Sequence, residues 1–490
     1  MRLTPESRGI YSAELEKILR ELDAAGVPIH SFFVARGFEV VFDAYWAPFN
    51  ENTLHRMNSV TKSFVALGIG MLIDEGRINL SDKVIDYFPE IEREGLDASQ
   101  LSLTVENLLT MRTGYRPIGN GHWVRDREYD RIRRFFSRTP QTEINDSFYY
   151  DSTGSYILGV IVERLTGGSF VKYIQHKCLD DLGFSTDADC IKGGEGYSWS
   201  DSGLLCTTKD LYRYARLLAL GGEIDGVRYI SEDFARDAVS SKASTEVNAE
   251  YKSYGYGYQI WKAKYDGFMF LGMGAQILIY IPKRDLYVAC TADTQPDEKY
   301  REKIVDLMYE LIDADYERCA DSLPEDNAAY ASLYEYKENL KLVSMPKCKM
   351  PEKYKDFTTS AYKCDENPMG ITEFSFEFGD CSGIFRYTNA QGDKEIPFGF
   401  GHNEFSLFGE DGYFDMEIGV SPDGHRYPIA TSAMWQSECE LVITVQFIGR
   451  HLGGDIITVR FDSDTAVLKM KKTTNCFLDK YNGETVGTLK

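Results

Sequence analysis

The sequence lacks several patterns that would each indicate a particular class of protein. Its 10 cysteines are scattered singly without a C-x-x-C pair, so neither a zinc ribbon nor a thioredoxin-type site is predicted. Its 7 histidines show no H-x-x-x-H or other metal-ligand spacing. No apolar run reaches the roughly 18 residues that a membrane-spanning helix needs. We therefore expect no metal site and no membrane span.

Positive charge is also scarce. Lys and Arg number 54 against 76 Asp and Glu, so the formal net charge is −22. Such an excess of acid repels nucleic-acid phosphates and anionic lipid headgroups, and we expect neither as a partner. The first residues, 1–7, carry no apolar core of the secretory-signal type, so a cytoplasmic protein is expected.

The hydrophobic pattern divides the chain into two kinds of structure. Up to residue 320, helical periodicity alternates with short extended runs, whereas the pattern over 351–490 is almost entirely that of short strands. Between them, 321–350 contains a break at 322–327, a polar helical stretch and a proline. We predict a first domain at 1–320, a linker with a helix at 321–350 and a β domain at 351–490.

The first predicted domain has its strands near both ends. Extended runs at 31–35 and 38–42 precede a mostly helical region at 80–248, and further strands follow between 256 and 289. The simplest solution is an antiparallel sheet built from both ends, flanked by helices, with a mostly helical subdomain: an α/β (α+β) fold. The C-terminal domain is expected to be all-β, a barrel or a sandwich.

Ser59 is the candidate nucleophile, with Lys62 as its base. At i and i+3 in the first turn of an apolar helix over 59–76, their Cβ atoms lie about 5–6 Å apart. A serine hydroxyl needs an adjacent base, and the N–H groups at a helix start can stabilise an oxyanion.

The S-x-x-K pattern alone is weak evidence for a catalytic pair, because a capping serine and a solvated lysine also produce it. Four such tetrapeptides occur: Ser59/Lys62, Ser169/Lys172, Ser344/Lys347 and Ser360/Lys363. Only the first opens a buried apolar helix.

Residues 56–76, R-M-N-S-V-T-K-S-F-V-A-L-G-I-G-M-L-I-D-E-G, resemble the active-site helix of the serine β-lactamase-like superfamily. This superfamily includes class C β-lactamases, D-alanyl-D-alanine carboxypeptidases, family VIII carboxylesterases and 6-aminohexanoate-dimer hydrolases. Segments 77–89 and 103–114 resemble its continuation, and the resemblance covers about 30–345. It implies a β-lactamase/transpeptidase-like fold and an acyl-enzyme mechanism at Ser59 and Lys62, without metal or cofactor.

A second motif of this superfamily, Y-x-N, is matched by Tyr150-Asp151-Ser152. The resemblance implies that the Tyr150 phenol shares the general-base role with Lys62. It also implies that Ser152, in place of the usual asparagine, contacts Lys62 or a substrate amide. An ordinary core tyrosine is the alternative, and Tyr149 takes the role if the alignment shifts by one residue.

The third motif, usually K-T-G, H-x-G or W-x-G, is expected within 267–276, G-F-M-F-L-G-M-G-A-Q. This segment resembles the G-x-x-G-Q variant of the dimer hydrolases, which includes Gln276 in the substrate site. The resemblance implies that Gly272 lets substrate approach and that the N–H of Met273 joins that of Ser59 in an oxyanion hole. Phe270 stands where Lys or His is expected. A plain hairpin without catalytic function is the alternative.

The resulting prediction is a serine hydrolase that forms an acyl-enzyme with a small ester or amide. Without a cation at Phe270, good activity on β-lactams or peptide C-termini is not expected, although a β-lactamase or D-amino-acid peptidase remains an alternative. A second alternative is a binding or sensing protein that has lost the chemistry. The β domain, with Ser432-Ala433-Met434-Trp435, resembles lipocalin-like domains, and the resemblance implies a β-barrel over 351–490. Its role and the oligomeric state, including a homo-oligomer, stay open.

Overall fold

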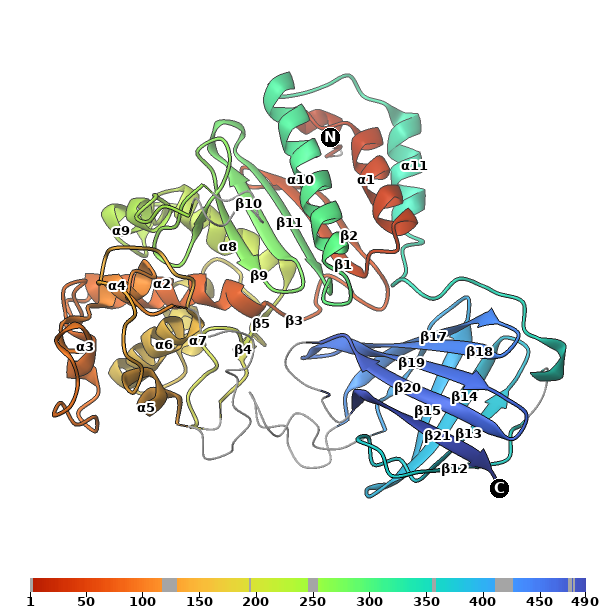
Figure 1. The fold of residues 1–490 in the computed structure, drawn as a ribbon. Coiled ribbons are helices and arrows are strands. Elements are labelled where there is room, and N and C mark those ends of the chain that lie inside the picture. Colours follow the sequence, from red (N-terminus) through yellow and green to blue (C-terminus); the bar gives the residue numbers. More distant parts are fainter. Residues whose placement is uncertain are drawn as a thin grey trace. The chain divides into compact units, whose positions relative to one another are not determined.

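The computed structural model describes the chain except for residues 1–2, 117–129, 194, 246–253, 355–357, 410–425, 475–477 and 479–480. The described residues form two compact units (Figure 1). The first unit comprises Met1–Thr294 and Lys299–Lys341, and the second comprises Gln295–Glu298 and Leu342–Lys490.

A six-stranded antiparallel sheet forms the centre of the first unit. Its order is β2-β1-β11-β10-β9-β8, so the N-terminal hairpin pairs with strands that follow about 250 residues later in the sequence. The strands are β1 (Ile29–Arg36), β2 (Glu39–Tyr45), β8 (Trp261–Lys262), β9 (Phe268–Gly272), β10 (Gln276–Ile281) and β11 (Leu286–Ala292). The predicted sheet built from both ends of the domain is confirmed.

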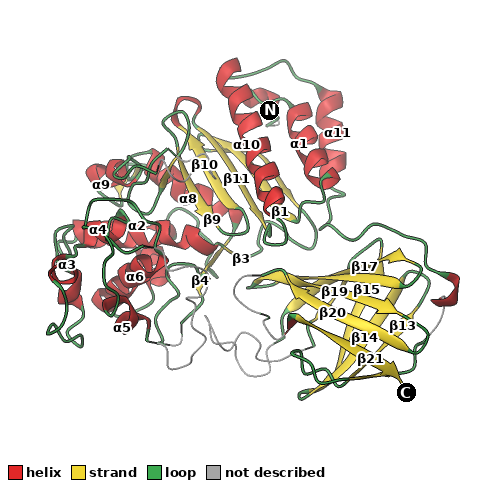
Figure 2. Cartoon of the chain, viewed as in Figure 1, coloured by secondary structure: helices red, strands yellow, loops and turns green. Residues whose placement is uncertain are grey.

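Helices cover both faces of this sheet (Figure 2). Successive side chains of a strand point to opposite faces, so each strand packs against both groups of helices. In β1, Phe32 and Val34 pack with one group of helices, whereas Phe33 and Ala35 pack with the other. The first group is α1 (Ser12–Ala24), α10 (Glu298–Arg318) and α11 (Asn327–Lys337). The second group includes α2 (Thr61–Asp74) and α8 (Thr208–Ala219). Helix α11 lies within the first unit, where Tyr336 donates a hydrogen bond to Asp23 of α1.

Helix α2 is the buried apolar helix that the sequence predicts. It is buried from Thr61 to Leu72, and close packing explains its glycine at position 70: a Cβ added there would overlap the ring of Phe234. The helix begins two residues later than predicted, because a 3₁₀ turn, η2 (Asn58–Val60), precedes it.

The helical subdomain surrounds α2. Its helices are α3 (Ala98–Ser102), α4 (Val105–Leu109), α5 (Arg131–Phe136), α6 (Ser152–Thr166), α7 (Phe170–Ile174) and α9 (Glu232–Ala238). Small sheets join its loops: β3 (His55–Arg56), β5 (Leu204–Cys206) and β4 (Asp189–Cys190), and separately β6 (Glu223–Ile224) and β7 (Val227–Arg228). The pairing of β3 with β5 brings the segment before α2 against the segment around residue 204.

The second unit is a barrel. Among its described residues, nine strands form a closed sheet. The closure is a parallel pairing of β15 with β17, in which Gly399 pairs with Ser432 and Phe400 with Ala433. Strand β16 pairs with β17 and extends the sheet. The strands are β12 (Tyr362–Cys364), β13 (Glu373–Phe378), β14 (Ser382–Asn389), β15 (Gly392–Phe400), β16 (Glu404–Leu407), β17 (Pro428–Ser437), β18 (Glu440–Ile448), β19 (Leu452–Phe461), β20 (Thr465–Lys472) and β21 (Gly483–Leu489). The barrel-like C-terminal domain that the lipocalin resemblance implies is confirmed.

Within the described part of the chain, no helix is long and apolar enough to cross a membrane.

One ionisable side chain lies among the apolar residues inside the barrel. Ile457, Val459 and Phe461 of β19 belong to its core, and Asp455 occupies the same alternating set at 1% exposure. Neither oxygen of the Asp455 carboxyl makes a hydrogen bond of good geometry to a described residue. Burial raises the pKa of this carboxyl to about 8, outweighing the nearby backbone amides of Lys471 and Ile456, which lower it.

We therefore predict that Asp455→Asn stabilises the barrel more at pH 8 than at pH 5. Between about pH 4 and the folded-state pKa near 8, the unfolded carboxyl is ionised while the folded one keeps its proton. Stability is then lost with rising pH at up to about 1.4 kcal/mol per unit. Calorimetry of the full chain at both pH values measures the difference. The exposed Asp464→Asn is the control, and an equal effect of Asp455→Asn at both pH values would contradict the prediction.

Candidate active site

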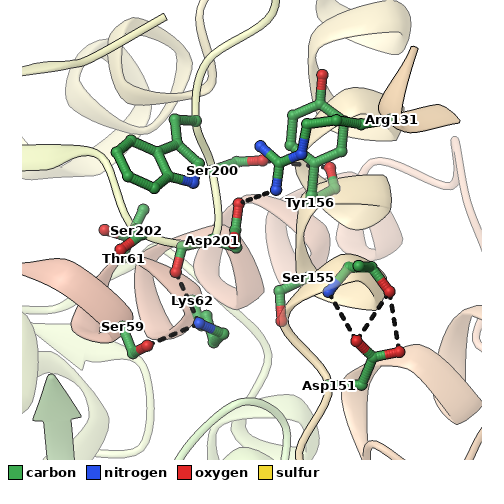
Figure 3. A network of polar contacts seen from close by, with 12 residues as sticks. Ser59, Thr61, Lys62, Arg131, Asp151, Ser155, Tyr156, Ser200, Asp201 and Ser202 are labelled. Atoms are coloured by element: carbon green, nitrogen blue, oxygen red, sulfur yellow. Dashed lines mark hydrogen bonds and ion pairs between the residues drawn. The ribbon is translucent and has the colours of Figure 1, made fainter. Parts of the chain in front are cut away.

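The structure brings the predicted nucleophile and base together. Ser59 lies in η2 and Lys62 in the first turn of α2, and Lys62 Nζ donates a hydrogen bond to Ser59 Oγ at 2.8 Å (Figure 3). The Lys62 side chain is buried, with the residue 1% exposed. Its second partner is the backbone carbonyl of Asp201, at 2.7 Å. The amine is thus within proton-transfer reach of the hydroxyl, as a general base must be.

Tyr150 is the tyrosine that faces this pair. Lys62 Nζ lies 5.2 Å from the centre of its ring, which stacks on Trp261 at 5.5 Å. Tyr149 instead lies under the guanidinium of Arg116, 5.5 Å from the ring centre. The arrangement therefore favours the alignment with Tyr150. In this structure Lys62 contacts the face of the Tyr150 ring, and its hydrogen bonds go to Ser59 and Asp201.

Ser152 is the first residue of α6, and it makes no hydrogen bond with Lys62. Its neighbour Asp151 caps this helix by accepting a hydrogen bond from the backbone N–H of Thr153 at 3.1 Å, and it forms a buried ion pair with Arg138. The contact with Lys62 that the resemblance implied for Ser152 is made instead by the carbonyl of Asp201.

The hairpin of β9 and β10 lies against the turn that holds Ser59. Gly272 ends β9, and a Cβ added there would approach the backbone oxygen of Met57 to under 3.0 Å. The side-chain amide of Asn58 donates a hydrogen bond to the backbone carbonyl of Met273 at 2.8 Å. The residue predicted to supply the second oxyanion N–H is therefore in direct contact with the residue before the nucleophile.

Two residues predicted to bind substrate lie in the interior instead. Gln276 is fully buried, and its amide donates to the backbone oxygens of Met273 at 3.0 Å and Ala292 at 2.7 Å, so it holds the hairpin together. Phe270 is also fully buried and stacks on Tyr214 at 5.3 Å. The ring of Phe270 also packs against Phe64 of α2 and supplies no positive charge, and its part in substrate binding stays a prediction.

Asp201, whose carbonyl accepts from Lys62, also forms an ion pair that the sequence does not predict. The Asp201 carboxylate is fully buried and pairs with Arg131 at 2.8 Å (Figure 3). Burial lowers the pKa of Arg131, but the negative charge of Asp201 and its hydrogen bond offset this, so the pKa is raised overall and the guanidinium stays charged. Arg131 is 70 residues from Asp201 in sequence. No local pattern connects them.

No group of three or more His, Cys, Asp or Glu side chains that could hold a metal is present among the described residues.

Comparison with known proteins decides the family. Residues 15–311 match the Beta-lactamase family model. The chain belongs to the Beta-lactamase family. Its relatives include the 6-aminohexanoate-dimer hydrolase of Paenarthrobacter ureafaciens, 28% identical over 225 residues, which are 43% of this chain and 57% of that protein. Esterase EstB of Burkholderia gladioli is 31% identical over 150 residues, which are 28% of this chain and 38% of that protein.

A solved structure agrees with this assignment. A protein from Bacillus anthracis assigned as a 6-aminohexanoate-dimer hydrolase superposes with a TM-score of 0.53 at 20% identity, covering 63% of this chain and 83% of that chain. This likeness shows the fold. The alignments span 57% and 38% of the lengths of these two relatives. The activities that their names state therefore belong to those proteins.

We predict that Gly272→Ala lowers the free energy of unfolding by about 1–3 kcal/mol, which is the usual cost of adding a methyl group to a closely packed site. The added methyl group would push β9 away from the backbone of Met57. Urea denaturation measures the change. Gly168→Ala is the matched control, because a Cβ at Gly168 would meet no atom within 4 Å. Equal stability of the Gly272 variant and the wild type would contradict the close approach.

Proposed function

We propose that this protein is a serine hydrolase that forms an acyl-enzyme with a small ester or amide. The observation that carries the proposal is the 2.8 Å hydrogen bond between Ser59 Oγ and the buried amine of Lys62. Membership of the Beta-lactamase family and the similarity to an esterase and to a 6-aminohexanoate-dimer hydrolase support it.

In the proposed first half-reaction, Ser59 Oγ attacks the carbonyl carbon of the substrate while its proton passes to Lys62 or Tyr150. The backbone N–H groups of Ser59 and Met273 stabilise the negative charge that develops on the carbonyl oxygen. As the tetrahedral intermediate collapses, the bond to the leaving alcohol or amine breaks. That group takes the proton, and the acyl group remains on Ser59.

The second half-reaction reverses these roles with water as the nucleophile. Lys62 or Tyr150 takes a proton from the water, whose oxygen attacks the acyl carbon. The ester bond to Ser59 then breaks, Ser59 Oγ regains a proton and the acid leaves. Lys62 Nζ lies 5.2 Å from the centre of the Tyr150 ring, so the proposal assigns this step to the two residues together.

The surroundings of the pair favour a neutral substrate. Phe270, at the position where related motifs carry Lys or His, is buried in the aromatic core. A substrate carboxylate directed to this position would lose its water without gaining a charged partner. A neutral ester or amide avoids that cost.

The first test is active-site labelling with a fluorophosphonate, read by intact mass. We expect one adduct on the wild type and none on Ser59→Ala, because phosphonylation needs the activated hydroxyl. Ser169→Ala is a matched control, since Ser169 begins another S-x-x-K tetrapeptide, and it should keep the adduct. An adduct that persists in Ser59→Ala would show that another residue is the nucleophile. A folded wild type that is never labelled would favour a binding or sensing protein.

The second test compares a neutral ester with a carboxylated β-lactam. We expect kcat/KM for p-nitrophenyl acetate to exceed that for nitrocefin by about 10-fold or more, because a hydrogen bond to a charged group is worth about 1.5–3 kcal/mol. Both rates are measured by absorbance on one preparation, with Ser59→Ala as the background. Faster turnover of nitrocefin would favour a β-lactamase.

A further inference from the structure

Asn58, the residue before the proposed nucleophile, combines three unusual features. Its backbone lies in the left-handed region with a φ of 47°, which non-glycine residues adopt uncommonly. It is 2% exposed although its side chain is polar. Its amide donates a hydrogen bond to the carbonyl of Met273, 215 residues further along the chain. A buried, strained residue that spans two elements indicates a constraint imposed by the site.

The backbone of Asn58 is held from the side of the helix. Its carbonyl accepts a hydrogen bond from Thr61 Oγ1 at 2.6 Å, and the same hydroxyl accepts one from the backbone N–H of Leu204 at 3.0 Å. Asn58 is thereby tied to the segment that also supplies the carbonyl of Asp201 to Lys62. Its conformation is therefore fixed independently of its contact with Met273.

The carbonyl of Met273 is held from two sides. It accepts the amide of Asn58 at 2.8 Å and the amide of Gln276 at 3.0 Å. Met273 begins a turn in which Gly274 and Ala275 both have positive φ, at 79° and 68°. With its carbonyl fixed by two donors, the Met273 residue cannot rotate freely with respect to Ser59.

We infer that Asn58 is a positioning residue for the oxyanion hole. Its side-chain amide fixes Met273 so that the N–H of Met273 and that of Ser59 point to the same oxygen. This inference rests on the proposed function, because it assigns a role within the same acyl transfer. Asn58 itself touches no reacting atom, so its removal should slow the chemical steps and leave ground-state binding unchanged.

The experiment is the substitution Asn58→Gly, assayed for p-nitrophenyl acetate hydrolysis. Glycine adopts the left-handed backbone without strain but lacks the amide, so it separates the two roles of Asn58. We expect kcat to fall about 10–100-fold with KM within about twofold, somewhat less than the loss of an oxyanion donor. Thermal unfolding checks that the variant is folded. Asp225→Gly is the control, because Asp225 has a left-handed φ of 51° but lies exposed between β6 and β7.

The outcomes distinguish a failure of this inference from a failure of the proposed function. Full activity of Asn58→Gly would overturn the inference and leave the hydrolase standing, since only the backbone conformation would then matter. A loss expressed in KM alone would also overturn it. Asn58→Asp, of the same size but without the donor, should lose activity like the glycine variant, and full activity would count against the inference. A wild type without activity or fluorophosphonate labelling would overturn the proposed function itself, and this inference with it.

Discussion

The structure of the first unit depends on the placement of one buried amine. Lys62 Nζ donates hydrogen bonds to the hydroxyl of Ser59, in the turn η2 before α2, and to the carbonyl of Asp201, in a loop 139 residues after Lys62. Placing an amine in an apolar interior is unfavourable unless its hydrogen bonds are made. Both partners must therefore be held rigidly, and much of the surrounding structure serves this requirement.

Three separate segments meet at this point because of the order of the strands. The pairing of β1 with β11 brings the two ends of the first unit into one sheet, and β9 and β10 follow next to them. The pairing of β3 with β5 joins the segment before Ser59 to the loop of Asp201. Because α2 is apolar on nearly all sides, it can lie between the sheet and the helical subdomain, with its first turn at the junction of the three segments.

The parts of this arrangement that the sequence predicts are those governed by local spacing. Ser59 and Lys62 are one helical turn apart, so a single helix is sufficient to bring them together. The resemblance implies that Phe270 and Gln276 line the substrate site, but the strand pattern does not predict that both side chains are fully buried. The Asp201–Arg131 pair and the contact of Asn58 with Met273 join residues 70 and 215 positions apart, and no local pattern encodes them.

Buried charges in the first unit are mostly paired, which makes Lys62 distinctive. Asp315 lies between Arg36 and Arg284, and Asp201 is paired with Arg131, so each of these buried carboxylates has a partner of opposite charge. Among the described residues, Lys62 makes hydrogen bonds to a hydroxyl and a carbonyl and lies over the ring of Tyr150. A buried ionisable group without an opposite charge is costly for stability, and such groups occur preferentially where they take part in chemistry. The surroundings of Lys62 therefore support the proposed proton transfer between Ser59 and this amine.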